Sequence, residues 1–585
     1  MVIVSNHRYI FQIVFLCLYM ESSFSAETAD PVSLTLGTHH LVDNTLLSGL
    51  TNGTYFELGE VQKDIDHPLL IPEYPWENAL HFYTSLLFLP ANVSSTGSAQ
   101  WLLYYACSNE ILFFNPIGLC VAMSTDSISW SKPLLNIHPY TANGTLPPVP
   151  TNIIFITESN TFGLQVFRDS RVGITRNAQI ILAYESLLNG QRYLKSAISS
   201  DGLHFSPQMY SPSDSPAIPY SGFADTMVSV FYDKPFDRYL AYGRNDIDIN
   251  NSTNSCPGAN PVFRELRATI KSCESKSSCN VSDSNGWSPT EIILPPGYPD
   301  VRDCVDNYNP SAFSINDAGT GSLYFLLPSV MRHIPLNQSG APDTRAGAND
   351  GFMDIRLAIS RNGYNFTFPS RNAFIRRGIG SRDSNSGLYN ASGSDRDAGF
   401  VFATNTGFLD LDQAITPAPK TPSPWVYILY WGSQTTHAGG GAYLYRYWPG
   451  AFTGIFKAKM RREGWVSLST LPNDLIGAGS ARTIALFLPK PNKGFGLFLK
   501  FNAAVDAAGA FSIAILSADT LQPINGFSHE ECESFYGNGI RQLLLCKGAP
   551  NGDVSALAVN GTPVVLEFLL THAKVYSWTI DEQSM

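Results

Sequence analysis

The chain has 585 residues, of which 44% are hydrophobic, 12% aromatic and only 15% charged. A chain of this length exceeds what one hydrophobic core usually holds, so we expect at least two domains. Low charge together with many Tyr, Phe, Gly and Pro residues is typical of a β-rich, loop-rich protein and excludes intrinsic disorder. The formal net charge of −11, without a long basic run, argues against nucleic acid as a partner.

The first 26 residues have the pattern of a secretory signal peptide. His7 and Arg8 precede an apolar run over Tyr9–Met20, and small residues follow at Ser25 and Ala26. The run is shorter than the roughly 20 residues that a membrane-spanning helix needs, and an uncleaved anchor is the alternative interpretation. No later segment is long and apolar enough to span a bilayer. We therefore expect a secreted, extracellular protein with no membrane partner after cleavage.

Cysteines and glycosylation sequons agree with secretion. Eight cysteines follow the signal segment, and an even number in an exported chain favours disulfides. Cys107 with Cys120, and Cys532 with Cys546, have spacings at which a disulfide closes a hairpin. Ten N-x-S/T sequons indicate N-glycosylation. No CxxC pair indicates a zinc site, so we expect neither a metal nor a cofactor.

One short motif recurs in the first three quarters of the chain. It reads Ser, any residue, Asp or Asn, Gly or Ser, two residues and an aromatic, and its third position is Asp126, Asp201 or Asn362. Each copy follows a short apolar strand. Asp and Asn side chains accept hydrogen bonds from backbone two residues on, and Gly adopts positive φ. The motif therefore predicts a tight turn, and the exchange of Asp for Asn argues against an acid with a chemical role.

The spacing of these turns predicts the architecture. The second interval between motifs is about twice the first, which leaves room for one further unit and for a Cys-rich insertion near Asp246–Trp287. About five units of four strands result, and radial repetition of such units forms a β-propeller. The pattern changes near Met460 to alternating and apolar runs typical of a β-sandwich. The prediction is an all-β chain with a signal peptide at 1–26, a five-bladed propeller at 27–460 and a sandwich at 461–585.

Several segments carry a family resemblance in their order and spacing: "WLLYYAC…LCVAMSTDSISWSKP", "VFRDSRVG", "VFYDKPFDRYLAYGRND", "DIRLAISRNGYNFTFPSRNAFIRRG" and "VYILYWGSQTTH". With these, the chain resembles the five-bladed propeller glycoside hydrolases of the invertase and arabinanase type, and especially the glycosyl-hydrolase-like proteins of that superfamily. The C-terminal "GWVSLST", "SADTLQPINGFSHEEC" and "VVLEFLLTHAKVYSW" resemble the small β-sandwich that often follows such propellers. The resemblance covers most of the mature chain. It implies a secreted carbohydrate-active protein, and specifically a glycoside hydrolase that cleaves glycosidic bonds with paired carboxylates in the propeller funnel. Its partner would be an oligo- or polysaccharide.

Glycosidic cleavage needs two carboxyl groups on either side of the scissile bond. The resemblance implies that these come from inner strands of the first three blades, and the expected pair is Glu77 in blade one and Asp225 before the blade-three strand Met227–Phe231. Asp169, in "FRDSR", resembles the RDP signature whose Asp binds substrate hydroxyls, with Ser170 where the family has Pro. Blade three lacks the usual Glu. The alternative is therefore a non-catalytic glycan-binding or extracellular matrix protein.

Six further residues lie beside strand ends, where a funnel would expose them to substrate. They are Trp76, Arg168, Arg244, Asp306, Tyr308 and His437. The Trp offers a sugar-stacking surface, the two Arg side chains bind carboxylates, phosphates or hydroxyls, and the His follows a blade-five strand in a Gly-rich loop. Asp64 and Asp66 are alternatives to Glu77. Nothing in the sequence specifies an oligomeric state.

Overall fold

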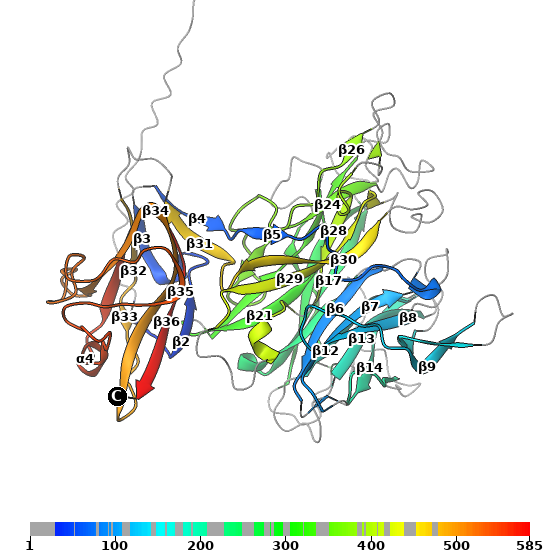
Figure 1. Cartoon of the computed structure of the whole chain (residues 1–585), viewed down its shortest axis with the longest axis horizontal. Helices are drawn as coiled ribbons and strands as arrows, with labels where there is room; N and C mark the ends of the chain where they lie inside the picture. Colours follow the sequence, from blue (N-terminus) through cyan, green and yellow to red (C-terminus); the bar gives the residue numbers. More distant parts are fainter. Residues whose placement is uncertain are drawn as a thin grey trace, which may run out of the picture.

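The structure is a computed structural model of the chain, and two β-rich parts make up most of it (Figure 1). It describes residues 30–584 except 52, 78–80, 92, 95–96, 108–117, 142–147, 158–160, 170–179, 189–190, 208–226, 249–261, 274–280, 282–285, 296–304, 320, 335–349, 383–388, 391–393, 406, 415–421, 438–451 and 471–477. The strands labelled β6 to β30 form one part, and β31 to β36 lie in the other with the first N-terminal strands.

The first three blades are four-stranded antiparallel sheets whose strands follow the chain. Blade one contains β6 (His81–Leu89), β7 (Gln100–Cys107), β8 (Gly118–Ser124) and β11 (Ile153–Ile156). Blade two contains β12 (Thr161–Arg168), β13 (Ile180–Leu188), β14 (Gln191–Ser199) and β15 (Ser206–Pro207). Blade three contains β16 (Ser229–Asp233), β17 (Arg238–Asp248), β18 (Val262–Ser272) and β19 (Glu291–Leu294).

Blades four and five are joined through an additional three-stranded layer. Blade four contains β21 (Ala312–Asp317), β22 (Gly321–Leu326) and β25 (Ala358–Ser360). The layer contains β20 (Val305–Asn309), β23 (Ser329–His333) and β24 (Gly351–Ile355). Blade five contains β28 (Phe400–Ala403), β29 (Trp425–Ser433), β30 (Thr453–Arg461) and β5 (Val61–Lys63). Because β5 precedes blade one in the chain, its pairing with β30 closes the ring. The prediction of a five-bladed propeller is confirmed.

Smaller elements lie between the main strands of both parts. They are the hairpins β9 (Leu135–Tyr140) with β10 (Val149–Thr151) and β26 (Ser381–Arg382) with β27 (Tyr389–Asn390), and the 3-10 turns η1 (Asn44–Leu46), η2 (Pro75–Glu77), η4 (Lys234–Phe236) and η6 (Leu411–Ala414).

Buried polar side chains join the inner strands of the first three blades. The backbone N–H of Val166 in β12 donates to Ser85 Oγ in β6 at 3.1 Å. Gln165 Nε2 donates to the carbonyl of Val230 in β16 at 3.0 Å, and the Val230 N–H donates back to Gln165 Oε1. A buried polar group costs free energy unless it is hydrogen-bonded. The pairing of these groups therefore fixes the depth at which each strand passes the axis.

The same type of contact continues around the ring. Ser229 Oγ in β16 donates to the carbonyl of Ala312 at 3.1 Å and accepts from its N–H at 2.9 Å. Ser311 Oγ donates to the carbonyl of Thr404, which follows β28, at 2.8 Å. The hydroxyls of Thr404 and Thr84 are 2.8 Å apart, so blade five returns to blade one. We call these hydrogen-bonded side chains, with Ser85 and Gln165, the inner ring.

Asn405 completes the closure. Its N–H donates to the carbonyl of Thr84 at 2.9 Å, and it forms a parallel bridge with Ser85. Its Nδ2 donates to the carbonyl of Val228 at 3.1 Å, across the axis in blade three. Because these segments run parallel, the inner strands enter the ring on one side and leave it on the other. We call these the entry side and the exit side.

The recurring motif forms the predicted turns. Asp201 Oδ1 accepts from the N–H groups of Leu203 and His204, both at 2.9 Å, and Ser199 Oγ accepts from the N–H of Gly202. Gly202 has φ +79°. Burial opposes the charge on Asp201, but these donors outweigh it and lower its pKa to about 2. The carboxylate of Asp201 is thus engaged in stabilising the turn.

The other two copies make the same bonds. Asp126 Oδ1 accepts from the N–H groups of the second and third residues beyond it, as does Asn362 Oδ1. The residues in the Gly position, Ser127 and Gly363, have φ values of +62° and +83°. An amide oxygen replaces a carboxylate without loss of a bond, which explains why the repeat tolerates either.

The second part is built from ten strands that form one continuous sheet. They are β1 (Val32–Ser33), β2 (Gly37–His40), β3 (Leu47–Thr51), β4 (Thr54–Leu58), β31 (Val466–Thr470), β32 (Gly479–Thr483), β33 (Leu486–Phe487), β34 (Phe495–Ser517), β35 (Asn538–Leu543) and β36 (Val564–Ser584), with the short helix α4 (Ser555–Val559). The pairing of β34 with β36 shifts at Asn502/Ala503 and at Val505/Ala510. Bulges bend strands, so this sheet folds over as a sandwich around the core that contains Phe501, Phe511 and Phe568.

The sandwich takes strands from both ends of the described chain. Residues 32–58 supply β1 to β4, which pair with β33, β36, β32 and β31. The structure therefore differs from the expected division, in which the whole of 27–460 belongs to the propeller. The reason is that short strands contain too few alternating residues to show which sheet edge they pair with.

Two predicted disulfides are present, Cys107–Cys120 and Cys532–Cys546. Cys273 is disulfide-bonded as well, while Cys256, Cys279 and Cys304 lie outside the described residues. Within the described part of the chain, no helix has the length and apolar character required to cross a membrane.

A largely buried carboxylate connects the end of β30 to the sandwich. Glu463, at φ +60°, accepts from both terminal nitrogens of Arg541, from Ser577 Oγ at 2.6 Å and from Asn502. Burial opposes its charge, but the hydrogen bonds and the charge of Arg541 outweigh this and lower the pKa of Glu463 to about 2. The ion pair therefore favours the docked arrangement when Glu463 is ionised.

The inner ring predicts a large loss of stability for Gln165→Leu. The substitution keeps the side-chain size but leaves the N–H and C=O of Val230 unpaired, at about 1–3 kcal/mol for each orphaned group. Calorimetry should show a clear fall in the melting temperature. Gln413→Leu, at an exposed position of η6, is the matched control and should melt like the wild type. Equal melting of both variants would contradict the role of the ring.

The interdomain carboxylate predicts a pH-dependent effect of Glu463→Gln. Because the folded pKa of about 2 lies below the ordinary 4.5, the stabilisation is complete above pH 4.5 and is lost as the pH falls through 2. At pH 7 the variant should be less stable by about 3 kcal/mol, and the gap should close toward pH 2. Calorimetry across this range, with exposed Glu291→Gln as control, measures it; a pH-independent gap would count against the account.

Candidate functional site

Side chains from blade three, blade five and the additional layer converge on the entry side of the inner ring. The guanidinium carbon of Arg244 lies 4.4 Å from the ring centre of Tyr308. Tyr308 Oη is 2.8 Å from His437 Nε2. Asp306 lies in the same strand as Tyr308, β20. We call Arg244, Asp306, Tyr308 and His437 the funnel-mouth cluster. Four of the six predicted substrate-contact residues are thus brought together.

The lengths of the strands explain this convergence. Ser229, at the start of β16, pairs with Tyr242, so β17 continues past the inner strand and carries Arg244 to the entry side. Strand β20 precedes the inner-ring residue Ser311 in the chain. His437 follows the end of β29, whose last pair joins Ser433 to the start of β28. Blade three, blade five and the layer therefore place polar side chains above the same end of the inner strands.

Asp306 is held by two side chains that sequence reasoning missed. Its Oδ2 accepts from Arg264 Nη1 at 2.6 Å and lies 2.9 Å from His333 Nε2. Burial opposes the charge of Asp306, but His333 and Arg264 outweigh it and lower its pKa. The guanidinium of Arg264 also lies 4.9 Å from the ring centre of Tyr308. The sequence gives little signal for either residue, because Arg264 is one of several charged residues in β18 and His333 directly follows Arg332.

The charge of the cluster limits its chemistry. Two guanidinium groups flank the Tyr308 ring, and cations bind favourably at the face of an aromatic ring. The one carboxylate among them, Asp306, is kept ionised and is engaged by its partners. An ionised carboxylate cannot donate a proton, so Asp306 does not fit the role of general acid. Arg244, Tyr308 and Asp306 are buried, whereas His437 is partly exposed.

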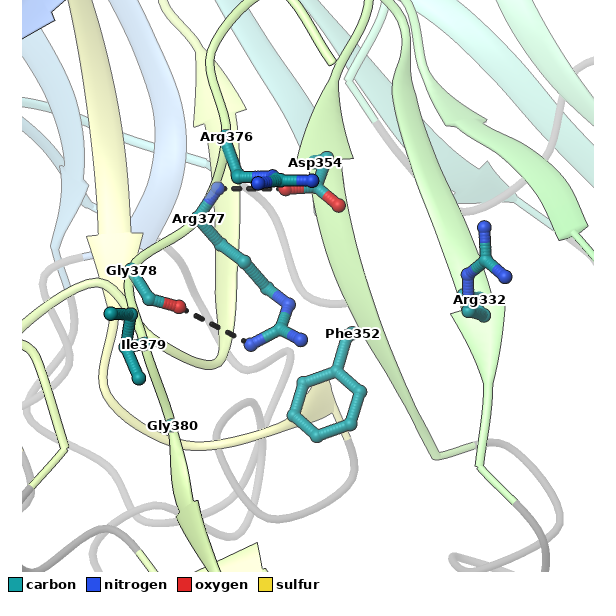
Figure 2. Close-up of a pocket in the computed structure, with 8 residues that line it drawn as sticks. All are labelled: Arg332, Phe352, Asp354, Arg376, Arg377, Gly378, Ile379 and Gly380. Atoms are coloured by element: carbon teal, nitrogen blue, oxygen red, sulfur yellow. Dashed lines mark hydrogen bonds between the residues drawn. The ribbon is translucent and has the colours of Figure 1, made fainter. Parts of the chain in front are cut away.

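The layer that carries Asp306 and His333 has a second, outward face. Adjacent residues of a strand point to opposite faces, so Arg332 faces away from His333. Figure 2 shows Arg332 and Phe352 beside a cavity of about 490 Å³ on this outward face.

Glu77 lies at the end of η2, just before the first strand of blade one, and is fully buried. Its Oε2 accepts from the N–H groups of Glu73 and Tyr74, at 2.9 and 3.2 Å, and from Lys132 Nζ at 2.8 Å. Its Oε1 accepts from Tyr105 Oη at 2.5 Å. Four donors therefore surround this carboxylate.

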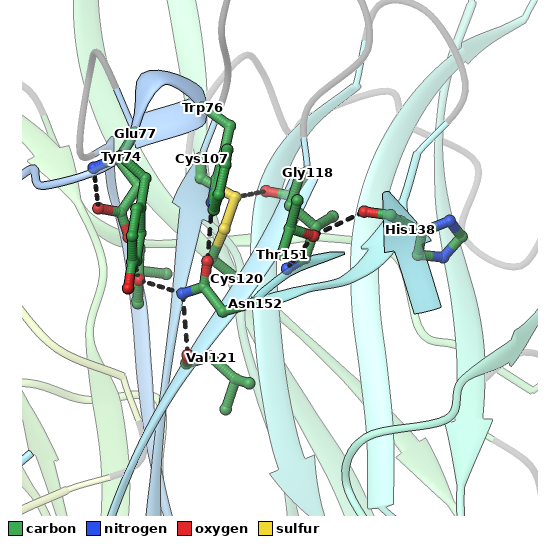
Figure 3. The surroundings of a disulfide bond; sticks show 12 residues. Tyr74, Trp76, Glu77, Cys107, Gly118, Cys120, Val121, His138, Thr151 and Asn152 are labelled. Carbon is green, nitrogen blue, oxygen red and sulfur yellow. Dashed lines mark hydrogen bonds between the residues drawn. A yellow bond between two sulfur atoms is a disulfide. The ribbon is translucent and has the colours of Figure 1, made fainter. Parts of the chain in front are cut away.

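Trp76 belongs to the same buried network, beside the Cys107–Cys120 disulfide (Figure 3). Its Nε1 donates to Asn152 Oδ1 at 2.8 Å, and Asn152 Nδ2 donates to Tyr105 Oη. The Trp76 ring stacks on Tyr74 with centroids 4.7 Å apart. Its surface is thereby used in packing, and it is 4% exposed.

Blade five repeats the arrangement around Glu77. Asp397 stands at the same sequence distance before Thr404 as Glu77 stands before Thr84. Asp397 Oδ2 accepts from Tyr430 Oη at 2.9 Å and from Lys63 Nζ at 2.7 Å. Blades one and five therefore share the same arrangement, in which a buried acid binds a tyrosine of the second strand and a lysine. Such repetition is expected for a structural role.

Asp169 lies on the exit side of the inner ring. It directly follows β12, whose inner-ring residue Gln165 precedes it, and Tyr239 Oη donates to its Oδ2 at 2.5 Å. Arg168 beside it is exposed. Glu77, in contrast, lies just before its inner strand, β6. Asp225 lies outside the described residues.

Among the described residues, no group of three or more His, Cys, Asp or Glu side chains is arranged to hold a metal ion.

Comparisons with known proteins come from structure alone. No family model matches the chain. No curated protein matches it either. The chain is similar to an N-acetylgalactosamine deacetylase from F. plautii in complex with blood group B trisaccharide (11% identity, 70% of this chain and 96% of the other, TM-score 0.39). It is also similar to the GH62 α-L-arabinofuranosidase catalytic domain of Coprinopsis cinerea (13%, 69% and 97%, TM-score 0.37) and to a Schwanniomyces occidentalis fructofuranosidase variant complexed with fructosylnystose (11%, 88% and 96%, TM-score 0.37).

Proposed function

We propose that this protein is a secreted carbohydrate-binding protein whose ligand site is the funnel-mouth cluster. The observation that carries the proposal is the convergence of Arg244 from blade three, Tyr308 from the additional layer and His437 from blade five on the entry side of the inner ring. Arg and His donors are suited to the hydroxyl and carboxylate oxygens of sugars. The signal-like N-terminus and the disulfides support the secretory route.

Binding without hydrolysis accounts best for the carboxylates that are described. Hydrolysis needs a protonated acid and a second carboxylate on opposite sides of one bond. Glu77 is surrounded by four donors, Asp306 is ionised and paired, and Asp169 lies past the inner ring.

The alternative is a glycoside hydrolase that uses Glu77 and Asp225 as the acid/base pair with Asp169 as the residue that orients the substrate. One observation favours it: Glu77 directly precedes the inner strand of blade one, where this mechanism requires a carboxylate. Loss of turnover in Asp225→Asn with unchanged glycan binding would support this alternative.

His437→Ala tests the proposed site. His437 is the partly exposed member of the cluster, so its removal should leave the melting temperature unchanged. Binding to an oligosaccharide found on a glycan array should weaken about tenfold, the equivalent of one lost hydrogen bond. His67→Ala is the matched control, because His67 is an exposed histidine of the propeller. Unchanged binding by His437→Ala, or no binding by the wild type, would sink the proposal.

Glu77→Gln separates the two interpretations. If the role of Glu77 is structural, the substitution removes the charge that pairs with Lys132 and leaves this lysine buried and poorly paired. The loss should cost about 3 kcal/mol and lower the melting temperature. Glu73→Gln is a matched control, since Glu73 binds the same lysine from an exposed position and should cost less than about 1 kcal/mol. A Glu77→Gln variant that melts like the wild type but loses turnover of aryl-glycosides would show catalysis instead.

A further inference from the structure

We propose that the outward face of β23 and β24 is a second binding site, for the sulfate esters of an acidic polysaccharide. The inference does not rest on the proposed function, because the site lies on the opposite face of the layer from Asp306 and His333.

Arginines dominate the described lining of this site. Two adjoining cavities, of about 490 and 160 Å³, both contact Arg332, Asp354 and Arg376. Among the described residues, five arginines line them: Arg332, Arg356, Arg371, Arg376 and Arg377. Asp354 is the one carboxylate in this described lining. Such an excess of positive charge in a chain of net charge −11 makes this face a local attractor for anions.

Strand pairing and a returning segment bring these arginines close together. Arg332 pairs directly with Phe352, and Val330 with Asp354, so their side chains share the outward face. The segment after β25 returns across this face, where Ile375 bridges to Ile355. It thereby delivers Arg376 and Arg377 to the side of the cavity opposite Arg332, as Figure 2 shows.

Two contacts give the site its shape. The N–H of Arg377 donates to Asp354 Oδ1 at 2.7 Å, which anchors the returning segment. The guanidinium of Arg377 lies 4.0 Å from the ring centre of Phe352 and donates to the carbonyl of Ala398 at 2.7 Å. One face of this guanidinium is thus fixed by an aromatic ring. Arg332 and Arg376 are exposed and project charge at the opening.

The arrangement fits a tetrahedral oxyanion repeated along a chain. A guanidinium offers paired N–H donors that match sulfate and phosphate oxygens. A single small anion would occupy one cavity, whereas two adjoining cavities with arginines in both accommodate groups at successive positions of a polymer. Among such polymers we commit to a sulfated glycan, because the signal-like N-terminus and the disulfides favour the extracellular compartment, where such glycans are found.

Heparin binding by the full mature chain tests the proposal. The double variant Arg332→Gln/Arg376→Gln removes two exposed charges, so it should melt like the wild type yet bind immobilised heparin about tenfold more weakly. Its binding should also depend less on salt. Lys490→Gln/Lys493→Gln, at exposed positions of the sandwich, changes the net charge equally and should bind like the wild type.

Ligand arms decide the chemistry. Fully desulfated heparin, which keeps its carboxylates, should not bind. The proposal is overturned if the arginine variant and the wild type bind heparin equally, if the lysine control loses as much, if desulfated heparin binds as well as heparin, or if the wild type does not bind. Arg371→Gln, also exposed, provides an independent substitution should the double variant melt early.

Discussion

The inner ring is the constraint on which the propeller depends. Buried hydroxyl and amide groups such as Ser229 and Gln165 bond directly to backbone of the next blade, and an unpaired group there would cost more than its hydrogen bond contributes. The depth of each inner strand is therefore set to within one residue. Strands β17, β20 and β29 extend beyond the ring. Their pairings with the inner strands or with the layer determine how far each one extends. The position of every polar group at the funnel mouth follows from this.

Much of the fold was predictable because it repeats. The turns at Asp126, Asp201 and Asn362 are recognisable in the sequence from their side-chain chemistry, and their spacing predicts the blades. Local disulfides were predictable from spacing as well. The pairing of 32–58 with the sandwich was not predictable, since partners so distant in sequence leave no local periodicity. The closure of blade five by β5 has the same character: three residues supply the outer strand.

The site was predictable in position more than in chemistry. Residues beside strand ends, such as Tyr308 and His437, meet because a propeller gathers those ends on one side. The partners of each carboxylate were hidden, however. Glu77 appeared to be an acid ahead of a strand, and only the three-dimensional contacts reveal Lys132 and Tyr105 around it. The position of Asp169 was ambiguous for a similar reason. Apolar runs lie on both sides of Asp169, so the sequence does not show whether the inner strand of blade two comes before it or after it.

One crystal structure of the protein with a bound oligosaccharide would test the account most directly. The account predicts sugar hydroxyls within hydrogen-bonding distance of His437 and Arg244, with Glu77 still bound to Lys132 and Tyr105. Carboxyl groups of Glu77 and Asp225 on opposite sides of one glycosidic bond, about 5 to 9.5 Å apart, would contradict it and establish the geometry of a hydrolase instead.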